Sequence, residues 1–271
     1  MKKILALSLA LVLCLGLLAG CGAKADENVI RVAASPTPHA EILAVAKEVL
    51  AKQGIELEIV EYTDYVQPNN VVDDGELDAN YFQHTPYLNT FNEEYGTDLV
   101  SVALIHYEPF GIYAGKTASL EEIQEGAQVI IPNDGSNETR ALLLLQQEGL
   151  ITLNEGIDAS SNATIHDIAE NPLNLDIVEM EAAQLPNSLP DVDIAVINGN
   201  YAIQAGLNAG TDALAIEDAS GDAAQTYANI LCVKAGNENN ENVQALIQAL
   251  QSDEVRSFIE ETYEGAVVPI F

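Results

Sequence analysis

Arg140 is the residue whose type and position most strongly suggest a binding chemistry. It is one of three arginines in a chain that carries 42 Asp and Glu side chains. It follows the stretch Pro132-Asn-Asp-Gly-Ser-Asn-Glu-Thr, where a predicted strand ends in a polar turn and a helix begins. A helix N-terminus favours anions, and a guanidinium can hold a carboxylate through two hydrogen bonds. The segment therefore predicts a carboxylate site, with a salt bridge to one of the protein's own acidic side chains as an equal alternative.

A second group of candidates lies in the segment 62–91, which holds six of the chain's fifteen aromatic residues. Within it, Asp78-Ala-Asn-Tyr-Phe-Gln-His-Thr-Pro-Tyr87 runs off a short predicted strand into a turn. Ligands of open α/β sheets bind outside the carboxyl ends of the strands. Aromatic rings and a histidine at such a place could wall an apolar ligand group such as a thioether. Composition alone favours the alternative, which is ordinary core packing around a structural histidine.

Two asparagines occupy comparable positions at predicted strand ends. Asn198 ends Ala195-Val-Ile-Asn198, and Asn229 opens a strand that leads to Lys234. A side-chain amide offers both a donor and an acceptor, so it can serve both ends of a zwitterion. Each asparagine alone is a weak indication, because Asn is also common in turns.

No pattern of the sequence indicates an enzyme, a metal centre or a bound cofactor. The chain has no His-x-x-x-His, no Cys-x-x-Cys, no Gly-x-Ser-x-Gly and no phosphate-binding loop. A binding protein without catalytic residues is therefore the expectation. Spacing alone leaves open a metal site made by histidines and carboxylates that the fold gathers, because the four histidines are dispersed: His39, His84, His106 and His166.

The charge of the whole chain excludes another class of partner. The 42 acidic and 10 basic side chains give a formal net charge of -32 over 271 residues. An excess of this size repels phosphate backbones, so we expect no nucleic-acid partner. Hydrophobic residues make up 48% of the chain, which is enough for a packed core.

The N-terminus has the pattern of a lipoprotein signal peptide. Lys2 and Lys3 precede an apolar run over residues 4–19, which is shorter than the roughly 20 residues of a membrane-spanning helix. Leu18-Ala19-Gly20-Cys21 follows and resembles a lipobox. We expect a signal peptide over 1–20, acylation of Cys21 that includes palmitate, and a tether over 21–28. The protein would then be anchored by lipid on the extracytoplasmic face of the cell membrane, and buried Cys232 would be its only other thiol.

The rest of the chain alternates strand-like and helix-like segments, which predicts an α/β protein with mostly parallel sheets. Two such sets suggest two lobes with a ligand cleft between them. The predicted strands cover residues 29–33, 55–59, 78–81, 99–105, 110–114, 128–131, 176–180, 193–197 and 229–234. The predicted helices cover residues 39–52, a short stretch after Pro68, 88–95, a short helix opened by a capping box at 119–122, 136–148 with Gly149 as its cap, 242–250 and 253–263.

These patterns together resemble a known family, the NlpA-type methionine-binding lipoproteins that serve ABC importers. The resemblance covers nearly the whole mature chain in the family's order. It rests on the lipobox at Cys21, Thr37-Pro-His-Ala-Glu-Ile-Leu43, Asp78 to Leu88, Pro132-Asn-Asp134, Arg140-Ala-Leu-Leu-Leu-Leu-Gln146, Glu170-Asn-Pro172, Glu181-Ala-Ala-Gln-Leu-Pro186, Ala195-Val-Ile-Asn198 and Gln251-Ser-Asp-Glu-Val255.

The resemblance implies a type II periplasmic-binding-protein fold, in which lobe 1 (29–108 and 228–271) is interrupted by lobe 2 (109–227). Hinges would lie near Glu108 and Tyr227. By the same resemblance Arg140 would hold a ligand carboxylate, and Asn198 and Asn229 would hold its amino and carboxylate ends. The residues around the thioether would be Tyr65, Phe82, His84 and Tyr87. Two features depart from the family's usual pattern: the turn that precedes Arg140, and Tyr81, which lies where other members vary. These departures affect which ligand side chain is expected more than the expectation that the ligand is an amino acid.

The function implied is capture of methionine, with D-methionine left open, and its delivery to an ABC permease and ATPase by a monomeric binding protein. A Gly-Met dipeptide, another apolar amino acid, and a surface adhesin or sensor role are the alternatives. We expect Arg140→Ala to abolish binding and to leave the melting temperature of the unliganded protein nearly unchanged.

Overall fold

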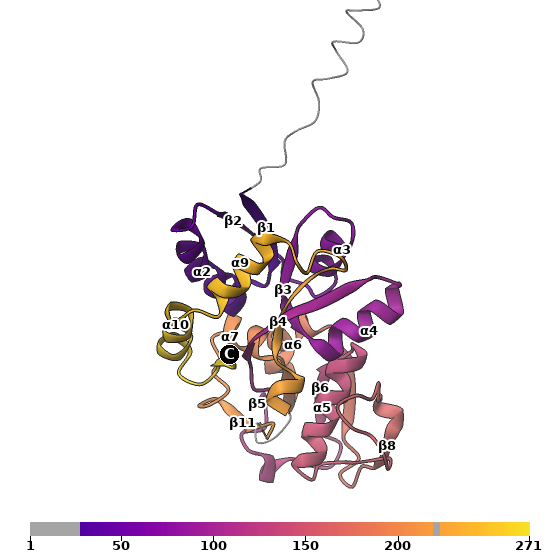
Figure 1. The fold of residues 1–271 in the computed structure, drawn as a ribbon. Helices are drawn as coiled ribbons and strands as arrows, with labels where there is room; N and C mark the ends of the chain where they lie inside the picture. The colour runs from indigo at the N-terminus through magenta and orange to yellow at the C-terminus, as the bar shows by residue number, and fades with distance from the viewer. Residues whose placement is uncertain (1–27, 219–222) are drawn as a thin grey trace, which may run out of the picture.

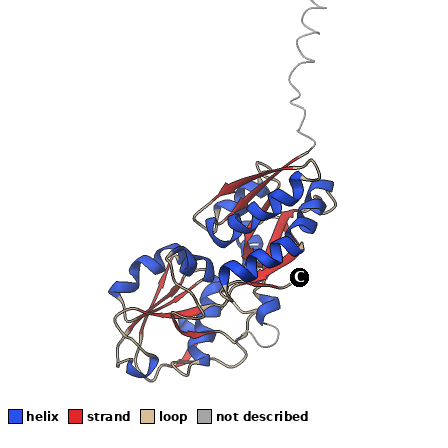
Figure 2. Ribbon diagram, turned by 90° about the vertical axis from the view of Figure 1, so that its left-hand side faces the viewer, coloured by secondary structure: helices blue, strands red, loops and turns tan. Residues whose placement is uncertain are grey.

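A computed structural model describes residues 28–218 and 223–271 of the chain. The predicted signal peptide, Cys21 and all but the last residue of the predicted tether lie outside these residues. Figures 1 and 2 show two lobes, each with a sheet covered by helices. The predicted α/β architecture with two lobes is therefore present.

The first lobe is built on a sheet with strand order β13-β4-β12-β3-β1-β2. Its strands come from both ends of the described chain. They are β1 (Val29–Ala34), β2 (Glu56–Glu61), β3 (Ala79–His84), β4 (Leu99–Tyr107), β12 (Asn229–Lys234) and β13 (Val268–Pro269). The helices of this lobe are α2 (Glu41–Ala51), α3 (Gln67–Asp73), α4 (Thr85–Tyr95), α9 (Glu241–Leu250) and α10 (Asp253–Tyr263), with the turn η1 (Pro36–Ala40) before α2.

The second lobe is built on a sheet with strand order β11-β5-β10-β6-β9. These strands are β5 (Gly111–Ala114), β6 (Gln128–Pro132), β9 (Asp176–Met180), β10 (Ile194–Ile197) and β11 (Ala213–Ile216). The helices are α5 (Gly135–Gln147), α6 (Leu185–Ser188), α7 (Gly199–Gln204) and α8 (Ala223–Thr226). A small ribbon of β7 (Thr152–Leu153) and β8 (Ile168–Glu170) and the 3-10 turns η2 (Leu120–Glu122), η3 (Ile165–Asp167), η4 (Ala182–Gln184) and η5 (Leu189–Asp191) complete it.

Each lobe has its own apolar core, which explains why the sequence contains two sets of periodic segments. In the first lobe, apolar residues of α2, α9 and α10 share one buried cluster with residues of β1, β2 and β3, and Leu43, Leu246 and Ile259 are among its fully buried members. In the second lobe, Leu142 and Leu145 of α5 pack on β6 and β10. Burial of each such side chain stabilises the fold by about 1.5–3 kcal/mol.

The chain crosses between the sheets twice, after β4 and before β12. Strands of the first sheet end at residue 107 and resume at 229, whereas those of the second sheet lie between 111 and 216. On this sheet membership we propose the lobe limits 29–108, 109–227 and 228–271.

The prediction of mostly parallel sheets is wrong. Among the described strands, six pairings are antiparallel and four are parallel. The cause is the double crossing: β4 carries the chain out of the first lobe and β12 brings it back beside β4, so the two must run in opposite directions. The alternation of strands and helices in the sequence indicates βαβ units. It does not indicate where the chain returns to an earlier sheet as an antiparallel strand.

Most predicted elements are confirmed to within a few residues, and one local prediction is wrong. Gly149 has a φ of 71° after α5, the left-handed conformation expected of a helix C-terminus. Ser119, however, makes no capping hydrogen bond, and the segment is a single 3-10 turn. Ile123, with φ -58° and ψ 126°, leaves the helical conformation and ends the turn. A capping box forms instead between Thr164 and Asp167.

Candidate functional site

A small cavity between the two lobes is lined by all seven of the predicted ligand-binding residues. The space open to the centre of a water molecule is about 20 Å³, close to the minimum that holds one water. A ligand of amino-acid size therefore enters only when the lobes or the lining side chains move apart. The lining residues are Tyr65, Phe82, Gln83, His84, Tyr87, Glu108, Asn137, Arg140, Asn198, Gly199, Asn200 and Asn229.

The ends of strands deliver these residues, as the sheet topology requires. His84 is the last residue of β3 and the N-cap of α4. Asn198 follows β10 and is the N-cap of α7, and Arg140 lies in the first half of α5, which follows β6. Asn229 opens β12 and pairs with His84 in the first sheet. Both lobes thus direct strand ends into the same cleft.

One wall of the cavity is aromatic. The ring centroids of Tyr65 lie 5.8 Å from Phe82 and 5.7 Å from Tyr87, in tilted and edge-on arrangements that aromatic pairs prefer. The Tyr87 hydroxyl donates to the backbone oxygen of Tyr65 at 2.9 Å. The Tyr65 hydroxyl donates across the cleft to Oδ1 of Asn200 at 2.5 Å. The wall therefore belongs to the first lobe, but one of its hydroxyls is anchored in the second.

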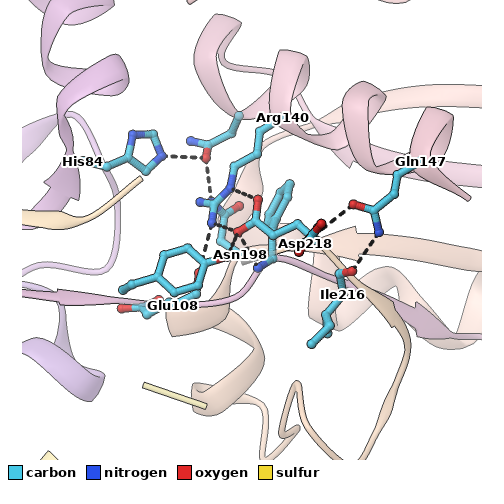
Figure 3. Close-up of polar contacts among 11 residues, drawn as sticks. His84, Glu108, Arg140, Gln147, Asn198, Ile216 and Asp218 are labelled. Atoms are coloured by element: carbon cyan, nitrogen blue, oxygen red, sulfur yellow. Dashed lines mark hydrogen bonds and ion pairs between the residues drawn. The ribbon is translucent and has the colours of Figure 1, made fainter. Parts of the chain in front are cut away.

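His84 is a neutral member of this wall. The backbone N–H of Tyr87 donates to its Nδ1 at 3.2 Å, so its proton is on Nε2, which donates to Oδ1 of Asn137 at 3.1 Å. Burial, and secondarily the charge of Arg140, lowers the pKa of His84 to about 3. Figure 3 shows His84 and Arg140 reaching toward the cleft from different elements. An uncharged ring can contact an apolar group without the cost of burying a charge.

Asparagine side chains at the start of α5 and α7 are linked by hydrogen bonds, but two of the polar atoms in this region have no hydrogen-bond partner among the described residues. Asn198 donates from Nδ2 to Oδ1 of Asn137 at 2.9 Å, and Asn137 donates in turn to the carboxylate of Asp134. Oδ1 of Asn198 and Nδ2 of Asn200 are buried and have no hydrogen-bond partner among the described residues. Since buried polar groups are nearly always paired, one acceptor and one donor here point to a polar ligand.

Arg140 is not free for the ligand in the way the sequence suggested. Its side chain is 5% exposed, and its Nε and Nη2 contact both carboxylate oxygens of Glu217, with Nε donating at 2.8 Å. Nη2 also donates to the backbone oxygen of Glu108 at 3.0 Å, and the guanidinium lies 4.2 Å from the ring centroid of Tyr227. The salt-bridge alternative is therefore realised, and Arg140 itself lines the cavity. Only Nη1 has no partner among the described residues.

A buried cluster of His39, His106 and Glu108 borders the cavity through Glu108, and the potential metal-ligand atoms of the three residues are within 4.8 Å of one another. His106 donates from Nε2 to Glu108 at 2.8 Å, and its Nδ1 then accepts from the Tyr81 hydroxyl. His39 donates from Nε2 to Oδ1 of Asn229 at 2.8 Å. This is the set of described residues that could hold a metal ion, but a metal would have to displace these hydrogen bonds.

Sequence reasoning missed several residues of the site. Glu108 entered only as a hinge position, Asn137 only as an unassigned member of the turn before Arg140, and Asn200 and Glu217 did not enter at all. Asn200 could have been noticed, because it lies two residues after Asn198 at the same strand end. Glu217 carried no such signal, since it is 77 positions from Arg140 and is one acidic residue among 42.

A search of the described residues for membrane-spanning segments finds no helix with the length and apolar character needed to cross a bilayer.

Comparison with known proteins identifies the kind of molecule that this site belongs to. The sequence profile of the NlpA lipoprotein family matches residues 30–271. Membrane lipoprotein TpN32 of Treponema pallidum is 43% identical over 98% of this chain and 94% of its own length. D-methionine-binding lipoprotein MetQ of Escherichia coli K12 is 41% identical over 93% of this chain and 92% of its own.

A solved structure agrees with these relatives. A nutrient-binding protein from Burkholderia cenocepacia, solved with bound methionine, superimposes with a TM-score of 0.85 at 44% identity, covering 89% of this chain and all of the other. The likeness confirms the predicted two-lobe fold of the binding-protein type, and the family resemblance read from the sequence is confirmed as well.

Proposed function

This chain belongs to the NlpA lipoprotein family, and from that premise we propose that it is a lipid-anchored solute-binding protein that captures methionine and delivers it to an ABC importer. It acts by binding and releasing its ligand, without catalysis or a cofactor. The relatives named for methionine binding and the methionine-bound structure support the ligand.

One observation about this chain carries the proposal. The seven residues that the sequence singled out line a single cavity between two lobes. That cavity has an aromatic wall, a buried acceptor on Asn198 and a buried donor on Asn200, and neither of these two groups has a hydrogen-bond partner among the described residues. An amino acid with an apolar side chain has the matching parts: an ammonium, a carboxylate and a group to pack on the rings.

We assign the ligand contacts on this geometry. Nη1 of Arg140 and the amides of Asn229 and Asn200 would donate to the carboxylate, and Oδ1 of Asn198 would accept from the ammonium. Tyr65, Phe82, His84 and Tyr87 would surround the thioether. Burial of the side chain contributes about 1.5–3 kcal/mol, and micromolar affinity requires about 8 kcal/mol in total. The polar contacts supply the remainder at roughly 1.5–3 kcal/mol for each charge-assisted bond.

Identification of the natural ligand is the decisive experiment. The protein is purified without added amino acids and denatured, and the released small molecules are measured by mass spectrometry. Calorimetric titrations of ligand-free protein with L-methionine, D-methionine, Gly-Met and leucine follow. We expect methionine to be released and to bind most tightly among the four. Release of another compound, with no heat from methionine, would refute the proposed ligand.

The anchor and the transport partners are tested separately. We propose that Cys21 is acylated, that the monomer is held on the extracytoplasmic face of the membrane, and that its closed form docks on a permease driven by an ATPase. In cells, Cys21→Ser should move the protein from the membrane fraction to the soluble fraction, whereas Cys232→Ser, at the buried thiol, should not. Deletion of a permease gene adjacent to this one should abolish methionine uptake that depends on the protein.

A further inference from the structure

Two charged side chains line the cavity among the described residues, Arg140 and Glu108, and their charges are compensated unequally. Arg140 already has a full counter-charge, because both carboxylate oxygens of Glu217 contact its guanidinium. Glu217 also accepts hydrogen bonds from the Tyr107 hydroxyl at 2.5 Å and the Phe110 N–H at 3.0 Å, which hold it in that position. The carboxylate in contact with Arg140 is therefore a fixed part of the protein.

Glu108 has hydrogen bonds but no cation of its own. Its Oε1 accepts from Nε2 of His106 at 2.8 Å and lies 3.6 Å from Nε2 of His39. Nδ1 of His106 accepts from the Tyr81 hydroxyl, and Nδ1 of His39 has no partner among the described residues, so each ring carries one proton, on Nε2, and is neutral. Among the described residues, no Lys or Arg side chain forms an ion pair with Glu108. Its negative charge is thus only partly compensated.

The environment of Glu108 places a second acceptor beside it. A Cβ built on Gly199 would lie 2.6 Å from Cβ and 2.7 Å from Oε2 of Glu108, so the start of α7 is in close contact with this carboxylate. Asn198, the residue before Gly199, carries the unmet acceptor Oδ1 and is 5% exposed. A carboxylate and a neighbouring amide oxygen, both lining one cavity, form a receptor for a group that only donates hydrogen bonds.

We propose that Glu108 is the specificity-determining counter-ion for the ligand's α-ammonium group, and that the ammonium contributes more to affinity than the carboxylate does. The inference rests on the proposed function and extends it. The site selects primary α-amines with an apolar side chain over the corresponding hydroxy acids. Arg140, whose charge is neutralised by Glu217, adds a hydrogen bond from Nη1 rather than a full ion pair.

Ligand analogues test the inference on the unmodified protein. L-methionine is compared by calorimetry with its 2-hydroxy acid, which lacks the ammonium, and with methioninol, which lacks the carboxylate. Loss of a charge-assisted contact costs about 10- to 150-fold in affinity. We expect the hydroxy acid to bind at least about 10-fold more weakly than methioninol. The reverse order, or equal affinities of hydroxy acid and methionine, would overturn the proposal.

The variant Glu108→Gln assigns the effect to one side chain. It keeps the shape and a hydrogen-bonding oxygen but removes the charge. Its affinity for methionine should fall about 10- to 150-fold, whereas its affinity for the hydroxy acid should be unchanged or higher. Equal losses for both ligands would indicate a structural effect and contradict the role of Glu108. Glu260→Gln, at an exposed position of α10, is the matched control and should alter neither affinity.

Failure of the inference can be told apart from failure of the proposed function. If the natural protein binds no methionine, the proposed function fails. The same comparison is then made with leucine and its 2-hydroxy acid. Tighter binding of leucine supports the role of Glu108, and equal or weaker binding of leucine refutes that role. If methionine binds and the affinity survives loss of the ammonium, the function holds and the role of Glu108 is refuted.

Discussion

Arg140 and Glu217 form a buried ion pair in which both oxygens of the carboxylate contact the guanidinium. The pair lies in the second lobe, joining α5 to the segment that follows β11, and it borders the ligand cavity. It ties two segments of the lobe together, and under the proposed function it also presents Nη1 of Arg140 to the ligand.

Arg140→Ala should lower both affinity and stability. The substitution leaves the carboxylate of Glu217 buried without a cation, and breaking such a pair typically costs about 3–5 kcal/mol. The ion pair with Glu217 thus leads us to replace the expectation of an unchanged melting temperature, which treated Arg140 as a ligand contact alone, by a predicted loss of stability. Urea denaturation of ligand-free protein measures the effect. Arg256→Ala, at a partly exposed side chain stacked on Phe271, should cost less than about 1 kcal/mol.

Tyr65→Phe should weaken ligand binding with little change in the aromatic wall. It removes the hydroxyl that donates to Oδ1 of Asn200 across the cleft, so Asn200 loses the contact that orients its unmet Nδ2. Loss of one hydrogen bond corresponds to about a 2- to 10-fold fall in affinity. Calorimetry with methionine tests this, and Tyr62→Phe, whose ring does not line the cavity, should bind as the natural protein does. No change in Tyr65→Phe would mean that the bond across the cleft does not matter for the bound state.

Gly199→Ala should be poorly tolerated. A methyl group there would lie 2.6 Å from Cβ of Glu108, closer than real side chains approach, so the start of α7 or Glu108 must shift. Overpacking of this kind costs about 1–3 kcal/mol and would also displace the proposed ammonium receptor. Thermal melting and methionine titration report the two effects. Gly210→Ala, where the nearest atom is the Asn208 side chain at 3.3 Å, is the control.

Glu138 should make stability depend on pH. Burial, together with a hydrogen bond and repulsion from Glu179, raises its pKa to about 8. The folded state then keeps a proton that the unfolded chain, with an ordinary carboxyl pKa near 4.5, releases. This contribution is fully present below about pH 4.5 and is lost as pH rises toward 8, with a slope of at most about 1.4 kcal/mol per pH unit.

Glu138→Gln should flatten this dependence, because the amide keeps the neutral form at every pH. Urea denaturation at intervals between pH 5 and pH 8 measures the free energy of unfolding of both proteins. Glu170→Gln, at an exposed position of β8, should leave the slope unchanged. A slope as steep in Glu138→Gln as in the natural protein would contradict the assignment.

The sequence by itself determined the elements and most of the cavity residues. Hydrophobic periodicity depends on neighbours three, four or two positions away, so α2, α9 and β2 could be predicted without knowing the fold. The rule that ligands meet strand ends singled out Arg140, Asn198 and the aromatic segment 62–91, and the family resemblance narrowed that segment to the residues of the aromatic wall. Each of these signals is local or is carried by residue type.

Only the tertiary structure decided the partners. Arg140 could have paired with any of 42 acidic residues or with a ligand, and the return of the chain after β11 is what brings Glu217 to it. The same long-range folding brought His39 and His106 to Glu108, and placed β12 antiparallel beside β4. Charge compensation depends on distance in space and on burial, neither of which a local pattern records. The sequence could therefore name Arg140, but the fold decided which of the acidic residues would neutralise it.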